Sequence, residues 1–184
     1  MNDIFTVVIR RKHSGIRPQD IVILLKILIL KSENWYIQDL VHSLKISLSE
    51  VSESLERSRF SGLLDQTKKR VNRQGLSDLL TYSIQYIFPV NPGPLVKGFP
   101  TGHSFAEFQE EFNSNVQFVW KDDAGTIIGQ EIEPLYKNQI FAIKQDQVLH
   151  KTLALVDLLR VGKKRERNFA SEKLISFIKE DKLL

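Results

Sequence analysis

Cysteine is absent from the chain of 184 residues. Its absence excludes disulfide bonds, thiolate nucleophiles and zinc sites with cysteine ligands, and it fits the reducing cytoplasm in which we expect this protein. The histidines lack the close spacings that hold a metal ion, because His13, His42, His103 and His150 are scattered along the chain. No phosphate-binding loop, dinucleotide fingerprint or Gly-x-Ser-x-Gly motif occurs. We therefore expect no enzymatic activity, no metal and no cofactor.

Long apolar runs are absent as well. The longest apolar segment, residues 21–30 (IVILLKILIL), is too short to cross a bilayer and carries Lys26 in its middle. The first residues contain no apolar run preceded by basic residues and no small-residue cleavage site, so they do not resemble a secretory signal. We expect residues 21–30 to form a buried helix, and we expect no membrane association.

A large excess of one charge sign is also missing. Residues 1–90 hold 13 basic and 9 acidic residues, whereas residues 91–184 hold 13 of each. The net charge of +4 therefore comes from the first half and favours a mild attraction to polyanions. With 42% hydrophobic residues, the chain can bury a substantial core.

Three helices are predicted within residues 18–61. Pro18 favours the start of the first helix, which we expect to end near residue 31. Apolar residues spaced by three and four predict a short second helix over residues 36–44. Ser47 and Glu50 then form a Ser-x-x-Glu capping box, which predicts a third helix over residues 48–61. Gly62 is suited to end this helix because glycine adopts positive φ without strain.

The remaining chain predicts a hairpin, a fourth helix, a loop-rich tract and two further helices. Extended pieces at residues 63–64 and 70–71 enclose a basic turn, and apolar periodicity predicts a helix over residues 76–87. Five of the six prolines lie between Pro89 and Pro134, which predicts little regular structure beyond two short strands around residues 123–125. Residues 146–161 and 163–180 are predicted to be helical.

The order of helix, helix, turn, helix and short basic hairpin resembles the winged helix-turn-helix of bacterial transcription regulators of the MarR and ArsR type. The local pattern is carried by Leu44, Ile46, Ser47, Ser49, Val51, Ser52, Leu55, Gly62, Leu63 and Leu64. This resemblance covers residues 16–90, and the same fold recurs in proteins that bind no DNA. Residues 91–184 are similar to an uncharacterised group of bacterial regulators, which implies no mechanism.

The resemblance implies that helix 48–61 enters the major groove of double-stranded DNA and that a basic wing over residues 65–73 contacts the flanking backbone. The positions that would face the groove are Ser47, Ser49, Glu50, Glu53, Ser54 and Arg57. The cations that would neutralise phosphates are Lys45, Arg57, Lys68, Lys69, Arg70 and Arg73. One such helix reads few base pairs, so we expect a homodimer. Candidate dimer surfaces are the first helix, residues 4–11 and the helices from Gln147 onwards.

Two acids in the predicted reading helix have alternative roles. Glu50 occupies the third position of the capping box, where its carboxylate can bind backbone instead of DNA. Glu53 lies four residues before Arg57, so it can pair with that cation, accept from a cytosine amino group, or belong to a surface that docks a protein.

The sequence therefore predicts a mainly α protein with a small β-hairpin wing, an α+β chain in which residues 1–90 are the DNA-binding domain. Residues 91–184 are expected to form a helical extension with a role in dimerisation or sensing. Sequence-specific regulation of transcription is the favoured function. Two alternatives stay open: a protein-interaction module on the same scaffold, and a regulator that senses a small effector through residues 89–134.

Overall fold

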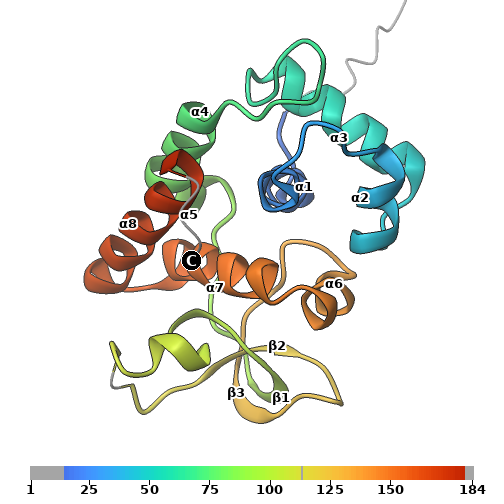
Figure 1. The fold of residues 1–184 in the computed structure, drawn as a ribbon. Coiled ribbons are helices and arrows are strands. Elements are labelled where there is room, and N and C mark those ends of the chain that lie inside the picture. Colours follow the sequence, from blue (N-terminus) through green and yellow to red (C-terminus); the bar gives the residue numbers. More distant parts are fainter. Residues whose placement is uncertain (1–14, 113, 181–184) are drawn as a thin grey trace, which may run out of the picture.

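Helices dominate the structure, a computed structural model that describes residues 15–112 and 114–180 (Figure 1). The first part contains α1 (Pro18–Leu30), α2 (Ile37–Leu44), α3 (Leu48–Phe60), α4 (Arg73–Asp78), a π-helical turn (Leu79–Ser83) and α5 (Ile84–Ile87). Strands β1 (Leu95–Pro100), β2 (Phe118–Lys121) and β3 (Ile127–Glu131) follow, with short 3-10 turns at Gly102–Ser104 and Ala106–Phe108. The chain ends with α6 (Gln139–Gln145), α7 (Gln147–Val161) and α8 (Lys164–Glu180). The protein is thus α+β and mainly helical, as predicted.

Helix α1 is buried on all sides. Every residue from Asp20 to Leu28 is buried, as expected for a helix that is apolar around its circumference. Figure 1 shows α1 nearly end-on, with α2 and α3 on one side, α4 and α5 on the other, and α7 below. The prediction of a buried first helix is confirmed. The prediction that this helix offers a dimer surface is wrong, because its side chains are covered by the same chain.

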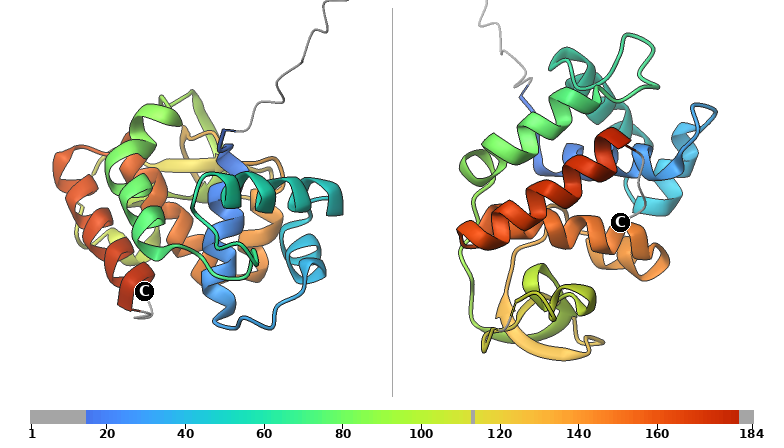
Figure 2. Two further views of the ribbon diagram at one scale, coloured as in Figure 1. Left: turned by 90° about the horizontal axis from the view of Figure 1, so that it is seen from above. Right: turned by 60° about the vertical axis from the view of Figure 1, so that its left-hand side comes forward.

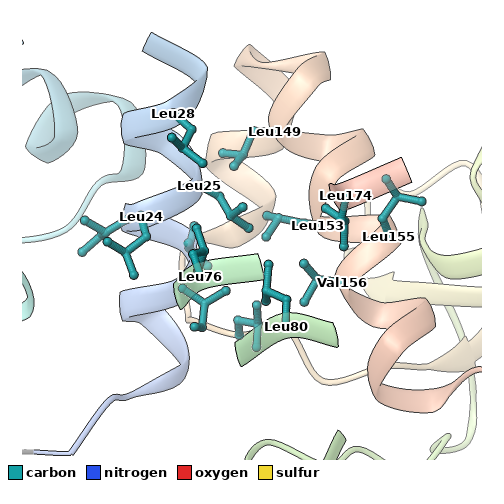
Figure 3. Packing of buried hydrophobic residues seen from close by; sticks show 14 of the residues in the cluster. Leu24, Leu25, Leu28, Leu76, Leu80, Leu149, Leu153, Leu155, Val156 and Leu174 are labelled. Atoms are coloured by element: carbon teal, nitrogen blue, oxygen red, sulfur yellow. The ribbon is translucent and has the colours of Figure 1, made fainter. Parts of the chain in front are cut away.

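One hydrophobic core joins the two halves of the chain. Figure 3 shows leucines of α1 facing side chains of α4, of the π-helical turn and of α7, and Leu174 of α8 beside residues of α7. The residues of this cluster labelled there are Leu24, Leu25, Leu28, Leu76, Leu80, Leu149, Leu153, Leu155, Val156 and Leu174. Most of α7 is buried as well, so it also offers little surface for a second copy. The predicted division near residue 90 therefore does not coincide with a gap in the core.

The charge of Lys26, which lies inside the apolar run of α1, is compensated by Asp146. Its ammonium lies 2.6 Å from Oδ2 of Asp146, and both side chains are largely buried. The other oxygen of Asp146 accepts the backbone N–H of Leu149 at 2.9 Å and caps the start of α7. This ion pair fixes α1 against the first turn of α7.

The predicted fourth helix is present but irregular. Asn72 caps its start by accepting the N–H of Gly75 at 3.0 Å, and the helix ends at Ile87, before Pro89. The π-helical turn in its middle adds a residue while Leu80 and Ile84 stay buried. Figure 2 shows α8 lying beside α4, which covers the outer side of this helix.

The three strands close on one another. Strand β1 pairs antiparallel with both β2 and β3, and the ends of β2 and β3 meet in parallel at Phe118 and Gln130. Strands β2 and β3 were predicted, but β1 was not, because prolines surround it. Gly98 makes the closure possible, since a Cβ at this position would lie 2.2 Å from the carbonyl oxygen of Trp120.

Asp157 of α7 holds the sheet against the helices. Its Oδ2 accepts hydrogen bonds from Thr101 Oγ1 at 2.8 Å and from Trp120 Nε1 at 2.7 Å. Its Oδ1 accepts from Arg160 at 2.7 Å. All of these groups are buried or nearly so, and the network links β2 and the residue after β1 to α7.

His150 gives the fold a pH dependence. Its Nε2 lies 2.8 Å from the carbonyl oxygen of Pro100, and burial lowers the pKa of His150 below the ordinary value of 6.5. Below pH 6.5 the unfolded chain therefore binds a proton that the folded chain excludes, so stability should fall as the pH falls, by at most about 1.4 kcal/mol per pH unit. Denaturant unfolding at pH 7.5 and 5.5 measures this loss.

The matched controls are two histidine substitutions. His150→Gln should reduce the loss of stability on acidification, whereas His42→Gln, at an exposed position of α2, should leave it unchanged. Equal acid sensitivity in the wild type and His150→Gln would show that other groups control this part of the profile.

Candidate nucleic-acid interface

The turn between α2 and α3 is held by the second half of the chain. Helix α2 ends at Leu44, and Lys45 follows in the left-handed region with a φ of 52°. The hydroxyl of Tyr136 donates to the carbonyl of Leu44 at 3.1 Å, and the amide of Asn138 donates to that of Lys45 at 2.7 Å. Two orphan carbonyls at the end of α2 are thereby satisfied. Residues far along the sequence therefore fix the start of α3.

The predicted capping box at the start of α3 is confirmed. The N–H of Glu50 donates to Ser47 Oγ at 3.3 Å, and the Glu50 carboxylate accepts from the Ser47 N–H at 3.4 Å. The Ser47 hydroxyl also donates to the same carboxylate at 2.9 Å. Glu50 is thus engaged by the first turn of its own helix.

Helix α3 has one buried and one exposed face. Val51, Leu55 and Ser58 are buried, and Ser54 lies on the same face with an exposed fraction of 0%. The exposed positions are Leu48, Ser49, Glu50, Ser52, Glu53, Glu56 and Phe60. The prediction that Ser54 faces outward is wrong, since a spacing of three from Val51 turns it toward the core.

Arg57 is also buried, with an exposed fraction of 7%. Its Nε and Nη2 donate to the two carboxylate oxygens of Asp20 at 2.9 and 2.6 Å, a bidentate ion pair across α1 and α3. Asp20 in turn accepts the N–H of Arg17 at 2.8 Å. The hydrogen bonds that Arg57 donates to Asp20 raise the pKa of Arg57, so the guanidinium stays charged. The prediction that Arg57 faces a groove or a phosphate is therefore wrong.

Two acids on the exposed face of α3, Glu53 and Glu56, have cationic partners within the chain. Glu53 lies 3.7 Å from Arg57, which confirms the predicted pairing four residues apart. Glu56 accepts from Arg59 and lies 2.6 Å from the ammonium of Lys68. The hydrogen bonds from Arg59 and then Lys68 lower the pKa of Glu56 to about 2. The Glu56 carboxylate therefore remains ionised, and the nearby cations compensate part of its charge.

The basic loop, residues 65–70, follows α3 and is closed by Asp65. One oxygen of Asp65 accepts the backbone N–H groups of Lys69 and Arg70 at 2.9 and 3.1 Å. The other accepts from the Thr67 hydroxyl, a hydrogen bond that lowers the pKa of Asp65. The predicted hairpin is reduced to a single antiparallel bridge between residues 64 and 71.

The basic residues after α3 differ in the contacts that their side chains make with other parts of the chain. Lys69 donates to the carbonyl of Trp35, and its ammonium lies 4.2 Å from the centre of the Trp35 ring. Arg70 lies 2.8 Å from the carboxylate of Glu33 in a largely exposed pair. Arg73 is half-buried and donates to the carbonyl of Ile178 at the end of α8.

At the other end of the site, Lys45 is exposed, with its ammonium 5.1 Å from the centre of the Phe141 ring. Four cations of the predicted set lie on either side of α3: Lys45 and Arg70 are exposed, and Lys68 and Lys69 are half-buried. Of the predicted groove residues, Ser47, Ser49, Glu50 and Glu53 are exposed on the same helix face.

Four residues beside this site were missed at the sequence level: Lys31, Ser52, Glu56 and Arg59. Ser52 and Glu56 follow from the helical spacing, since they lie three and seven residues after Ser49 on the exposed face. Arg59 could be found as a partner three residues after Glu56. Lys31 could not, because only the folded chain brings it near the basic loop.

The tract predicted to sense an effector borders a cavity of about 560 Å³. The ring of His103 is buried there, with Nδ1 2.8 Å from Glu166 and Nε2 2.7 Å from the carbonyl of Val116. Phe112, Phe118 and Val161 supply apolar lining, and Lys163 and Arg165 lie at the same cavity.

Comparison with family models, with curated proteins and with solved structures gives no match for this chain. Within residues 15–112 and 114–180, no cluster of three or more histidine, aspartate or glutamate side chains is arranged to bind a metal ion. In the same residues, every helix is too short or too polar to cross a bilayer.

Proposed function

We propose that residues 16–90 form a winged helix-turn-helix that binds double-stranded DNA, with α3 in the major groove and the basic loop as the wing on the backbone. The observation that carries this proposal is the exposed N-terminal face of α3, which begins directly after a tight turn and is flanked by surface cations on both sides. Ser49 and Ser52 present hydroxyls on this face, and these can bind phosphates or base edges.

The contact set differs from the one predicted from sequence. Arg57 and Ser54 are excluded from the contacts because they are buried, and Ser52 is added because it is exposed. Phosphate neutralisation then rests on Lys45, Lys68, Lys69 and Arg70. Binding to DNA requires Lys68 to turn from Glu56 toward a phosphate, and such an exposed ion pair costs little to break.

The proposal includes a homodimer that regulates transcription. We place its dimer surface on the fourth helix and not on the surfaces expected from the sequence. Tyr82 and Tyr86 project from the fourth helix with exposed fractions of 69% and 75%, and Ile87 is also exposed. Aromatic residues are enriched at interfaces between subunits. Selection of bound duplexes from a random pool would return a palindromic motif from a dimer that binds specific sequences.

The test of DNA contact is the salt dependence of binding to short labelled duplexes. Lys45→Gln and Lys68→Gln should each reduce the slope of log K against log salt concentration by about 0.9, because each removes about one phosphate contact. Lys121→Gln is the matched control, since this exposed lysine lies on β2, far from α3 (Figure 1). Wild-type binding without salt dependence would refute the proposal.

A docking surface for a basic protein is the second candidate, and the exposed ends of α3 favour it. Leu48 and Phe60 have exposed fractions of 48% and 69%, and Glu53 and Glu56 lie between them. An apolar pair with acids between suits a basic amphipathic partner more than a phosphate backbone. Glu53→Gln separates the two candidates: it should strengthen DNA binding, and it should weaken binding to a basic partner.

A further inference from the structure

A cationic cavity of about 410 Å³ lies beside the basic loop, among the end of α1, the connector to α2 and the start of α4. Ile27, Leu28 and Val71 supply its apolar lining. Its polar lining consists of Lys31, Ser32, Glu33, Lys69, Arg70 and Arg73. Four basic side chains therefore share this cavity with one carboxylate.

Separate elements hold these cations in place. Lys31 follows the last residue of α1 in the left-handed conformation, with a φ of 51°. Lys69 is fixed through Trp35, and Arg73 through the carbonyl of Ile178. The cavity is thus assembled by α1, the connector, the basic loop and the start of α4, and it exists only in the folded chain.

Two of the cations can engage a ligand at low cost. Arg70 pairs with Glu33 at 2.8 Å, but the two side chains are 68% and 60% exposed, and such surface pairs contribute little. Lys31 is exposed, and among the described residues its ammonium has no hydrogen-bond or ion-pair partner. A ligand with several negative charges would form an ion pair with Lys31 and could replace Glu33 as the partner of Arg70.

Size and charge together define the ligand class. The volume falls in the range of sites for small molecules, and a concave site suits a compact ligand better than a rigid duplex. Phosphate groups match guanidinium and ammonium groups in charge and in hydrogen-bond geometry. One carboxylate beside four cations leaves the cavity suited to an oligophosphate rather than a singly charged anion.

We propose that this cavity binds a small oligophosphate-bearing molecule and that the bound ligand opposes DNA binding. The opposition arises because Lys69 and Arg70 belong to both sites: cations that hold the ligand are withdrawn from the DNA backbone. This coupling rests on the proposed function, whereas the binding of the oligophosphate does not.

The binding test uses inorganic tripolyphosphate and the full chain, in isothermal titration calorimetry at constant ionic strength. Lys31→Gln and Arg70→Gln should each weaken binding about tenfold or more, the loss expected for one charge-assisted contact. Lys121→Gln, an exposed lysine outside the cavity, should bind like the wild type. Equal affinity in all four proteins, or wild-type affinity no higher than for sulfate, would overturn the proposal.

The coupling test adds tripolyphosphate to the complex with a labelled duplex, with sulfate of equal ionic strength as the reference. Tripolyphosphate should release DNA from the wild type and several-fold less from Lys31→Gln, a residue outside the predicted DNA contacts. Binding of tripolyphosphate by a protein that binds no duplex would overturn the proposed function and support the cavity. Loss of duplex binding in Lys31→Gln, without any response to tripolyphosphate, would assign the cavity cations to DNA phosphates and overturn the small-ligand proposal.

Discussion

Replacing Arg57 by alanine is expected to lower the free energy of unfolding by about 3–5 kcal/mol. The substitution leaves the carboxylate of Asp20, which has an exposed fraction of 0%, without its bidentate partner. An ionised carboxylate in a buried site is costly because it has lost its hydration shell. The loss should therefore far exceed that for a surface contact. Urea denaturation followed by circular dichroism measures it.

Arg59→Ala is the matched control on the same helix. Arg59 pairs with the exposed Glu56, so its removal should cost far less than the removal of Arg57. Asp20→Asn supplies a second check, because it removes the buried charge and should make a subsequent Arg57→Ala change much less damaging. Similar losses for Arg57→Ala and Arg59→Ala would show that the buried ion pair does not stabilise the fold.

The Arg57→Ala variant also tests whether Arg57 contacts DNA or only stabilises the fold. If Arg57 were a DNA contact, Arg57→Ala would weaken duplex binding by the fully folded protein. The structure instead places this side chain between α1 and α3, so binding should fall only in proportion to the unfolded fraction. DNA titrations at a temperature where the variant is folded distinguish the two outcomes.

Replacing Asp157 by alanine is the second substitution with a large expected effect, a loss of about 3–5 kcal/mol in the free energy of unfolding. It removes the acceptor for Thr101, Trp120 and Arg160 at once and leaves buried donors without a partner. Arg160 keeps its bonds to the carbonyls of Phe88 and Glu133, which limits the loss. Thermal unfolding and the fluorescence of Trp120 report the change.

Asp157→Asn distinguishes the loss of hydrogen bonds from the loss of charge. Burial raises the pKa of Asp157, so the charge itself is costly at this position. The asparagine keeps an acceptor for Trp120 and Thr101, and it should be distinctly more stable than the alanine variant. Equal instability of the two variants would attribute the effect to the pairing with Arg160 alone.

Much of the local structure could be predicted because it depends on neighbours in the sequence. The capping box of Ser47 and Glu50, the start of α1 at Pro18 and the end of α3 before Gly62 each involve residues a few positions apart. Strand β1 and helix α6 were missed. Strand β1 is stabilised by pairing with strands more than 17 residues away, and α6 has only seven residues.

The candidate site was predictable only in outline. The sequence marks α3 and the basic residues after it, but the pairing of Arg57 with Asp20 joins residues 37 positions apart. The turn before α3 depends on Tyr136 and Asn138, more than 90 residues away. Such contacts have no periodic signal, since they arise from the way separate helices pack.

The sequence by itself determined most of the helices of this protein, the capping box of α3 and the lack of cysteine chemistry, because these features follow from composition and from short-range spacing. Tertiary structure decided which charges are available. It buried Arg57 between two helices, joined Lys69 to Trp35, and placed Lys31 beside Arg70 at one cavity. The physical reason is that the energy of a charge depends on its burial and its partners, and both are set only when distant segments come together.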